Sequence, residues 1–146
     1  MAKDIIHDAV KNALVKDGWH ITHDPFRERG DSSMALVTTY STLIKQALNA
    51  YVSLVRKSPS PHYDVVCVFD DQHQQYVVRK LGWKEGRRIR QTVLHVALRN
   101  RKIWIEEDWT EDGIATYFLK DGVPPKDMVL GFQPPIMRPY TEFAVA

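Results

Sequence analysis

Cysteine is almost absent from this chain of 146 residues, and its single cysteine, Cys67, has no partner for a disulfide within the chain. Cys67 lies in the apolar run 65–69, where a thiol usually serves as a small buried hydrophobe. Glycine is also scarce, and the seven glycines are too scattered to form a loop that cradles phosphates. The sequence therefore excludes a disulfide scaffold and gives no support to nucleotide binding.

Long apolar runs and a secretory leader are missing as well. No segment approaches the ~20 apolar residues that a membrane-spanning helix requires, so we expect no membrane partner. Asp4 and Asp8 stand where a secretory signal would be basic, and no apolar region follows them. Together with the unpaired cysteine, these features predict a reducing, cytoplasmic location.

The composition that remains is that of an ordinary globular protein, with 44% hydrophobic and 26% charged residues. A chain of this length buries a core without help from disulfides or metals. The net charge of +2 argues neither for nor against nucleic acid, so the placement of the charges has to decide.

The chain divides into two parts by its sequence pattern. Apolar residues at helical spacing between Ile5 and Leu14 predict an extra N-terminal helix, which Gly18 ends. Charged and small residues at 24–33 predict a linker. We therefore expect an N-terminal segment, residues 1–33, and a domain, residues 34–146.

The domain is predicted to be α+β. An apolar stripe from Leu36 to Val55 predicts a long helix, which the Ser-Pro-Ser-Pro run at 58–61 ends. Tight turns then separate four expected strands, at 63–69, 74–83, 87–98 and 102–107. Because turns this short join antiparallel neighbours, the strands are expected to form an antiparallel sheet.

A shorter helix and a last strand complete the expected fold. Thr110 is predicted to cap the helix, with Glu111 and Asp112 in its first turn, and residues 128–130 form a short strand. The result is an antiparallel sheet of about four to five strands, with the long N-terminal and the shorter C-terminal helix packed on one face.

Acidic residues gather where this helix is expected to begin, at Glu106, Glu107, Asp108, Glu111 and Asp112. Clustered carboxylates can bind Mg²⁺ or act as an acid–base pair. A strand end and a helix start explain the same positions without any chemistry, and no catalytic motif is present. We predict no catalytic residue, no metal and no cofactor, so the chain is not expected to be an enzyme.

Basic residues gather upstream and give the candidate contact residues. The selected set combines charged and aromatic side chains: Arg79, Lys84, Arg87, Arg88, Arg90, Trp104 and Trp109. Such a surface suits DNA phosphates or an acidic protein partner. The alternative is an exposed strand edge that positive charge protects from aggregation. The sequence leaves both open.

Tryptophan placement adds to the case for an interface. Trp104 alternates with Ile103 and Ile105, so both faces of that strand need apolar cover, either from helices or from a partner. Trp83, which follows Gly82 at the end of an expected strand, is a second tryptophan placed where a partner could contact it. Exposure of these tryptophans and of Trp109 would indicate an interface, and core packing, the commoner use of any single tryptophan, is the alternative.

Several blocks of the domain resemble the XisI family. They are Lys-Ile-Trp-Ile-Glu at 102–106 with Asp108, Thr-Glu-Asp-Gly-Ile-Ala at 110–115, Gly-Val-Pro-Pro-Lys-Asp-Met-Val-Leu-Gly-Phe at 122–132, and Arg-Pro-Tyr-Thr-Glu-Phe-Ala-Val-Ala at 138–146. The pattern around Tyr76, Gly82-Trp83, residues 87–89 and Leu94-His95 fits too. The resemblance covers residues 34–146.

The N-terminal segment resembles the beginning of a different family, XisH. The similar residues are 2–14, 16–19 and 21–25, and the similarity is expected to stop near Phe26. XisH resembles restriction-endonuclease-like proteins, but the acids and lysine of such a nuclease centre have no counterpart here. We therefore interpret residues 1–33 as a remnant of XisH joined to a complete XisI-like domain.

The resemblance implies a controlling factor for excision of the fdxN element, a process of cyanobacterial heterocyst differentiation in which a site-specific recombinase does the strand chemistry. The implied partners are an XisH-type protein, the recombinase or both, with DNA and a second copy of the chain as further candidates. A direct DNA-binding module and an antitoxin-like inhibitor of a nuclease-like XisH are the alternatives.

Overall fold

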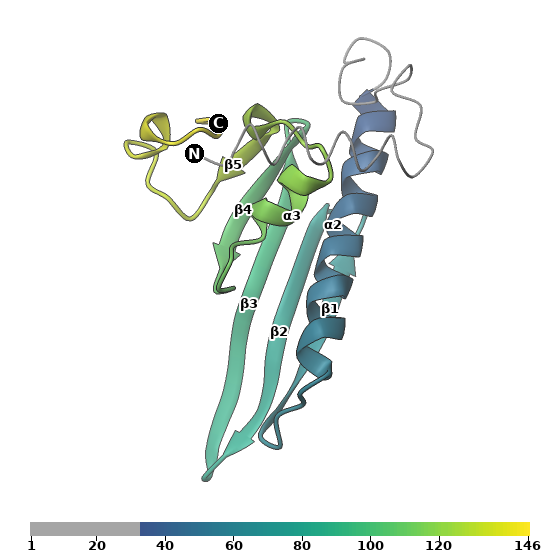
Figure 1. The fold of residues 1–146 in the computed structure, drawn as a ribbon, viewed down its shortest axis with the longest axis vertical. Helices are drawn as coiled ribbons and strands as arrows, with labels where there is room; N and C mark the ends of the chain where they lie inside the picture. The colour runs from purple at the N-terminus through teal and green to yellow at the C-terminus, as the bar shows by residue number, and fades with distance from the viewer. Residues whose placement is uncertain (1–32) are drawn as a thin grey trace.

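The structure, a computed structural model, describes residues 33–146. The expected helix at 5–14 and the linker that follows it lie outside these residues. Figure 1 shows one long helix lying across an open sheet, a short helix beside it, and an irregular C-terminal segment at one end of the sheet. Neither helix of the described part has the apolar length that would carry it across a bilayer.

The long helix, α2 (Ser33–Arg56), forms where the apolar stripe predicted it. Its buried positions recur at helical spacing and include Tyr40, Ile44, Leu48 and Val52. The helix ends just before Ser58 and Pro59, because proline has no N–H to continue the hydrogen-bond ladder.

Four strands follow in a meander, and their order in the sheet is their order in the chain. They are β1 (Tyr63–Asp70), β2 (Gln75–Lys84), β3 (Arg87–Arg99) and β4 (Lys102–Asp108). Each pairs antiparallel with the next, as expected. The turn from β2 to β3 contains Glu85 and Gly86, both with positive φ, the geometry of a tight two-residue hairpin.

The fifth strand, β5 (Met128–Leu130), departs from the antiparallel expectation because it runs parallel to β4. The chain between β4 and β5 passes through the helix α3 (Ala115–Lys120) and the 3-10 turn η2 (Pro125–Asp127), and a crossover of this kind returns a strand in the same direction. A second 3-10 turn, η3 (Arg138–Tyr140), lies in the C-terminal segment.

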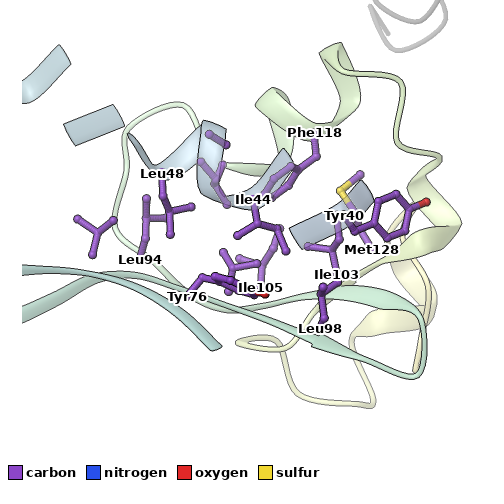
Figure 2. Packing of buried hydrophobic residues seen from close by; sticks show 14 of the residues in the cluster. Tyr40, Ile44, Leu48, Tyr76, Leu94, Leu98, Ile103, Ile105, Phe118 and Met128 are labelled. Atoms are coloured by element: carbon purple, nitrogen blue, oxygen red, sulfur yellow. The ribbon is translucent and has the colours of Figure 1, made fainter. Parts of the chain in front are cut away.

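The core lies between the helices and one face of the sheet. Figure 2 shows Tyr40, Ile44 and Leu48 of α2 over the sheet, with Phe118 of α3 beside them. The sheet contributes the buried residues Tyr76, Val78, Leu94, Val96, Ile103 and Ile105. Tyr40 also donates a buried hydrogen bond to the carboxylate of Asp127, which joins α2 to η2 and gives a buried acid a partner.

The start of the short helix was predicted wrongly. Helix α3 begins at Ala115 with Ile114 before it, so Thr110 does not cap it. The carboxylate of Asp108 binds the free backbone N–H groups here instead. Its Oδ1 accepts a hydrogen bond from the N–H of Thr110 at 2.9 Å, and its Oδ2 accepts one from the N–H of Ile114 at 2.7 Å. These bonds hold residues 109–114 in a loop, since a short acidic side chain competes with helical hydrogen bonds.

Candidate interaction surface

The β2–β3 hairpin brings the predicted basic residues together. Its register pairs Lys84 with Arg87, Leu81 with Arg90, and Arg79 with Thr92. Val78 and Leu94 face the helices, and a β-bulge beside them shifts the register so that Arg79 pairs with Thr92. Alternation along β2, carried across the pairs beyond this bulge, places Arg79, Arg88 and Arg90 on the opposite face of the sheet. We call the five residues Arg79, Lys84, Arg87, Arg88 and Arg90 the basic hairpin.

Most of the basic hairpin is open to solvent. Lys84, Arg87, Arg88 and Arg90 are exposed, whereas Arg79 is half-buried and donates a 3.3 Å hydrogen bond to the Thr92 hydroxyl. The local acid is Glu85 at the turn. The hairpin therefore presents a surface of net positive charge that can attract carboxylates or phosphates.

Trp83 belongs to this surface. Its side chain is 60% exposed, and the guanidinium of Arg88 lies 5.4 Å from its ring centroid. Arg88 also donates to the backbone oxygen of Gly82 at 3.1 Å, so the arginine is held beside the ring. An aromatic ring stacked with a cation offers both apolar area and charge to a partner.

Trp104, selected from the sequence as a candidate contact residue, is not exposed. It is 6% exposed and packs with Ala97, Val129 and Ala144 on the face of the sheet opposite the helices. The apolar cover that this strand requires comes from the protein's own C-terminal segment, where Ala144 forms an isolated bridge with Val129. In this structure Trp104 supports the fold.

Two arginines enclose the Trp104 ring. The guanidinium of Arg99 lies 3.6 Å from the ring centroid and that of Arg138 lies 5.3 Å from it. Arg138 also donates to the backbone oxygens of Gly131, Gln133 and Val145. Among the described residues, the buried Nε1 of Trp104 has no hydrogen-bond partner. Arg138 thus fastens the C-terminal segment over the tryptophan.

Trp109 is exposed, with 67% of its surface open. Its backbone N–H donates to the oxygen of Val93 at 2.9 Å, and its indole Nε1 donates to Glu107 at 2.8 Å. These bonds fix Trp109 where β4 ends, beside the middle of β3.

The acidic residues do not converge. Asp108 holds the loop described above, Glu106 lies 3.9 Å from Arg99, and Glu111 and Asp112 are exposed before α3. Within residues 33–146, no group of three or more metal-binding side chains comes together. Burial raises the pKa of the Cys67 thiol, which keeps it protonated and weakly nucleophilic.

One exposed apolar group was not selected from the sequence. Phe132, Ile136, Met137, Tyr140 and Val145 are all exposed along the C-terminal segment. The sequence did carry a signal for this exposed group: large apolar residues are interleaved with prolines at 134, 135 and 139. A segment with so many prolines does not form a regular buried strand.

Comparison with known families decides the relationship of this chain, because the family model of the XisI protein matches residues 34–145. The chain belongs to the XisI family. A model of the XisH protein also matches residues 1–50, so that similarity extends past Phe26 and overlaps the XisI match within α2. No curated protein matches the chain significantly.

Solved members of the XisI family have the same fold. An XisI-like protein from Anabaena variabilis is 31% identical, with a TM-score of 0.70, over 75% of this chain and 99% of that protein. The fdxN element excision controlling factor XisI from the same organism is 34% identical, with a TM-score of 0.68, over 76% of this chain and 99% of that one.

Proposed function

We propose that this XisI-family chain is a non-catalytic controlling factor for excision of a DNA element, and that it acts by binding a protein partner through the basic hairpin. The observation that carries the proposal is the exposed, positively charged end of β2 and β3, where Trp83 and Arg88 stack. The name of the related factor from Anabaena variabilis supports the role in excision control.

An XisH-type protein is the first candidate partner, with the recombinase as the second. The match of residues 1–50 to the XisH model supports this order, because the chain carries sequence of both families. In this proposal the hairpin contributes charge and an aromatic anchor, the features that concentrate binding energy at protein interfaces.

The test is binding of the purified chain to an intact XisH-type protein, measured by isothermal titration calorimetry. Replacing both Arg88 and Arg90 with alanine is expected to weaken binding by about 1–3 kcal/mol, the usual scale for charged groups at an interface. The matched control replaces Lys57, in the turn after α2, and Lys120, at the end of α3, with alanine; both are exposed away from the basic hairpin, and binding should be unchanged. Equal losses in both variants, or no complex with either XisH or the recombinase, would contradict the proposal.

Direct DNA binding is the second candidate function, and the shape of the hairpin favours it. A two-stranded ribbon with arginines fits the major groove of DNA. Each phosphate contact makes the logarithm of the association constant fall by about 0.9 for each tenfold rise in salt concentration. Titrations of a DNA duplex at several salt concentrations therefore test this function. If no DNA duplex binds even at low salt, direct DNA binding is ruled out.

Inhibition of a nuclease-like XisH partner, as an antitoxin would do, is the third candidate. Its support is the joined XisH-like and XisI-like sequence. An assay of DNA cleavage by an XisH-type protein, with and without this chain, tests it directly.

A further inference from the structure

Strand β3 is longer than the strand that covers its outer edge. β3 runs from Arg87 to Arg99, but β4 pairs with it only from Leu94 onward. Figure 1 shows β4 ending partway along β3, with the lower part of β3 bare on that side. Within the described part of the chain, no strand pairs with this edge from Arg87 to Thr92.

The pairing register shows which backbone groups this edge offers. Lys84 and Arg87 flank the two-residue turn and face each other, so the next residue, Arg88, turns its N–H and C=O away from β2. Alternation gives Arg90 and Thr92 the same outward direction. Three residues thus present strand-type donors and acceptors to the open side.

The opposite edge of the sheet is blocked near its start, at Val65 of β1. In β1 the N–H of Val65 is bound by the side chain of Asp64 at 2.8 Å, and the C=O of Val65 accepts from Arg56 at 2.7 Å. Such side-chain bonds prevent another strand from pairing there. The Arg87–Thr92 edge is therefore the better site for strand addition.

The chemistry of an added strand follows from the side chains beside it. Arg88 and Arg90 are exposed on the same face, so carboxylates on the incoming strand would meet them as cross-strand pairs. A second copy of β3 fits poorly, since antiparallel pairing centred on Arg90 sets that arginine against its own copy.

We propose that an acidic, extended segment of the protein partner adds to the edge of β3 between Arg87 and Thr92, in line with β4. This inference rests on the proposed function and specifies how the partner binds. At about 3.3 Å per residue the site spans about 20 Å, a usual strand length. Trp109 limits the strand-binding site at its Thr92 end, because the backbone N–H of Trp109 already donates a hydrogen bond to the oxygen of Val93.

Amide hydrogen exchange measured by NMR tests the edge directly. In the free protein the amides of Arg88, Arg90 and Thr92 are expected to exchange fast, and those of Ile89 and Gln91 slowly. A synthetic peptide in which glutamate alternates with valine should slow the three fast amides by about ten-fold or more. Fast exchange at all three amides under saturating peptide would overturn the proposal.

Two control peptides separate strand pairing from simple charge attraction. In the first, lysine replaces each glutamate, and in the second, alternate backbone nitrogens that would face β3 are methylated. Neither is expected to bind or to protect the amides. Equal binding of the acidic and the methylated peptide would show attraction by charge alone and would refute strand addition.

Variants of one residue give the matched test on the protein side. Arg90→Pro removes the outward N–H and the charge, whereas Arg90→Ala removes the charge only. Proline should abolish amide protection by the peptide at Arg88 and Thr92, and alanine should weaken it. If the proline variant does not fold, the methylated peptide still decides the question.

The intact partner distinguishes this inference from the proposed function. A partner that binds while Arg88, Arg90 and Thr92 keep exchanging fast refutes strand addition and leaves the proposed function standing. Absence of any partner complex, with protection by the acidic peptide, refutes the proposed function and leaves the edge as a strand-binding site. Protection of these amides by a DNA duplex and not by the acidic peptide overturns the inference.

Discussion

At the scale of single residues, Asp108 has the most specific role of the acids that suggest catalysis. One carboxylate satisfies the N–H groups of Thr110 and Ile114 and the hydroxyl of Thr110. Gly113, with φ of 80°, lets the chain turn around it. The sequence alone does not distinguish a loop held by Asp108 from a helix capped at Thr110. Both arrangements place acidic side chains near free backbone N–H groups at the start of a helix.

Replacing Asp108 with alanine is therefore expected to destabilise the protein by about 1–3 kcal/mol, since two backbone donors in a partly buried loop lose their acceptor. Urea unfolding followed by circular dichroism measures this loss. Asp112→Ala, at an exposed position of the same loop, is the control and should change stability little. Equal effects of the two substitutions would contradict the assigned role.

At the scale of elements, the helix α2 and the strands β1 to β4 were predictable, because helical spacing and tight turns are local signals. The parallel pairing of β5 and the burial of Trp104 were not predictable. Both depend on where residues 128–145 lie relative to β4, and local sequence does not encode such long-range contacts. The basic hairpin was predictable in composition, but the bare edge of β3 appears only when the lengths of β3 and β4 are compared.

The C-terminal segment depends on Arg138, which bonds three backbone oxygens and lies against Trp104. Arg138→Ala is expected to loosen this segment and to lower stability by about 1–3 kcal/mol. Acrylamide quenching of tryptophan fluorescence should increase as Trp104 becomes accessible. Arg101→Ala, at an exposed turn position, provides the control, and unchanged quenching in Arg138→Ala would show that the segment holds without the arginine.

At the scale of the whole molecule, a polar chain ties the helical layer to the sheet. Lys45 of α2 lies 2.8 Å from Asp71, which also accepts the hydroxyl of Tyr76 at 2.9 Å. The hydrogen bonds from Lys45 and Tyr76 lower the pKa of Asp71, whereas burial and the bond to Asp71 raise the pKa of Tyr76 from 10.0 to about 12.

These shifts predict how stability varies with pH. The folded state favours neutral Tyr76, so its contribution is complete below pH 10 and disappears as the pH rises towards about 12. The folded state favours ionised Asp71, so that contribution is present above the ordinary pKa of 3.8 and is lost as the pH falls through the lowered value. Unfolding free energies of Tyr76→Phe should fall less steeply between pH 10 and about pH 12 than those of the unsubstituted protein, and parallel curves would refute the assignment.

The cover over Trp104 also has a consequence for biosynthesis. Val129 and Ala144, which bury this tryptophan, are synthesised after β1 to β4 are complete. On the ribosome the sheet therefore carries an uncovered apolar face until the last part of the chain emerges, and during that interval it is open to chaperones or to aggregation. Nascent chains stalled on a linker that is fused after residue 127 and long enough to bring β4 out of the exit tunnel are expected to crosslink to a chaperone through this face, whereas released chains that include residues 128–146 are not.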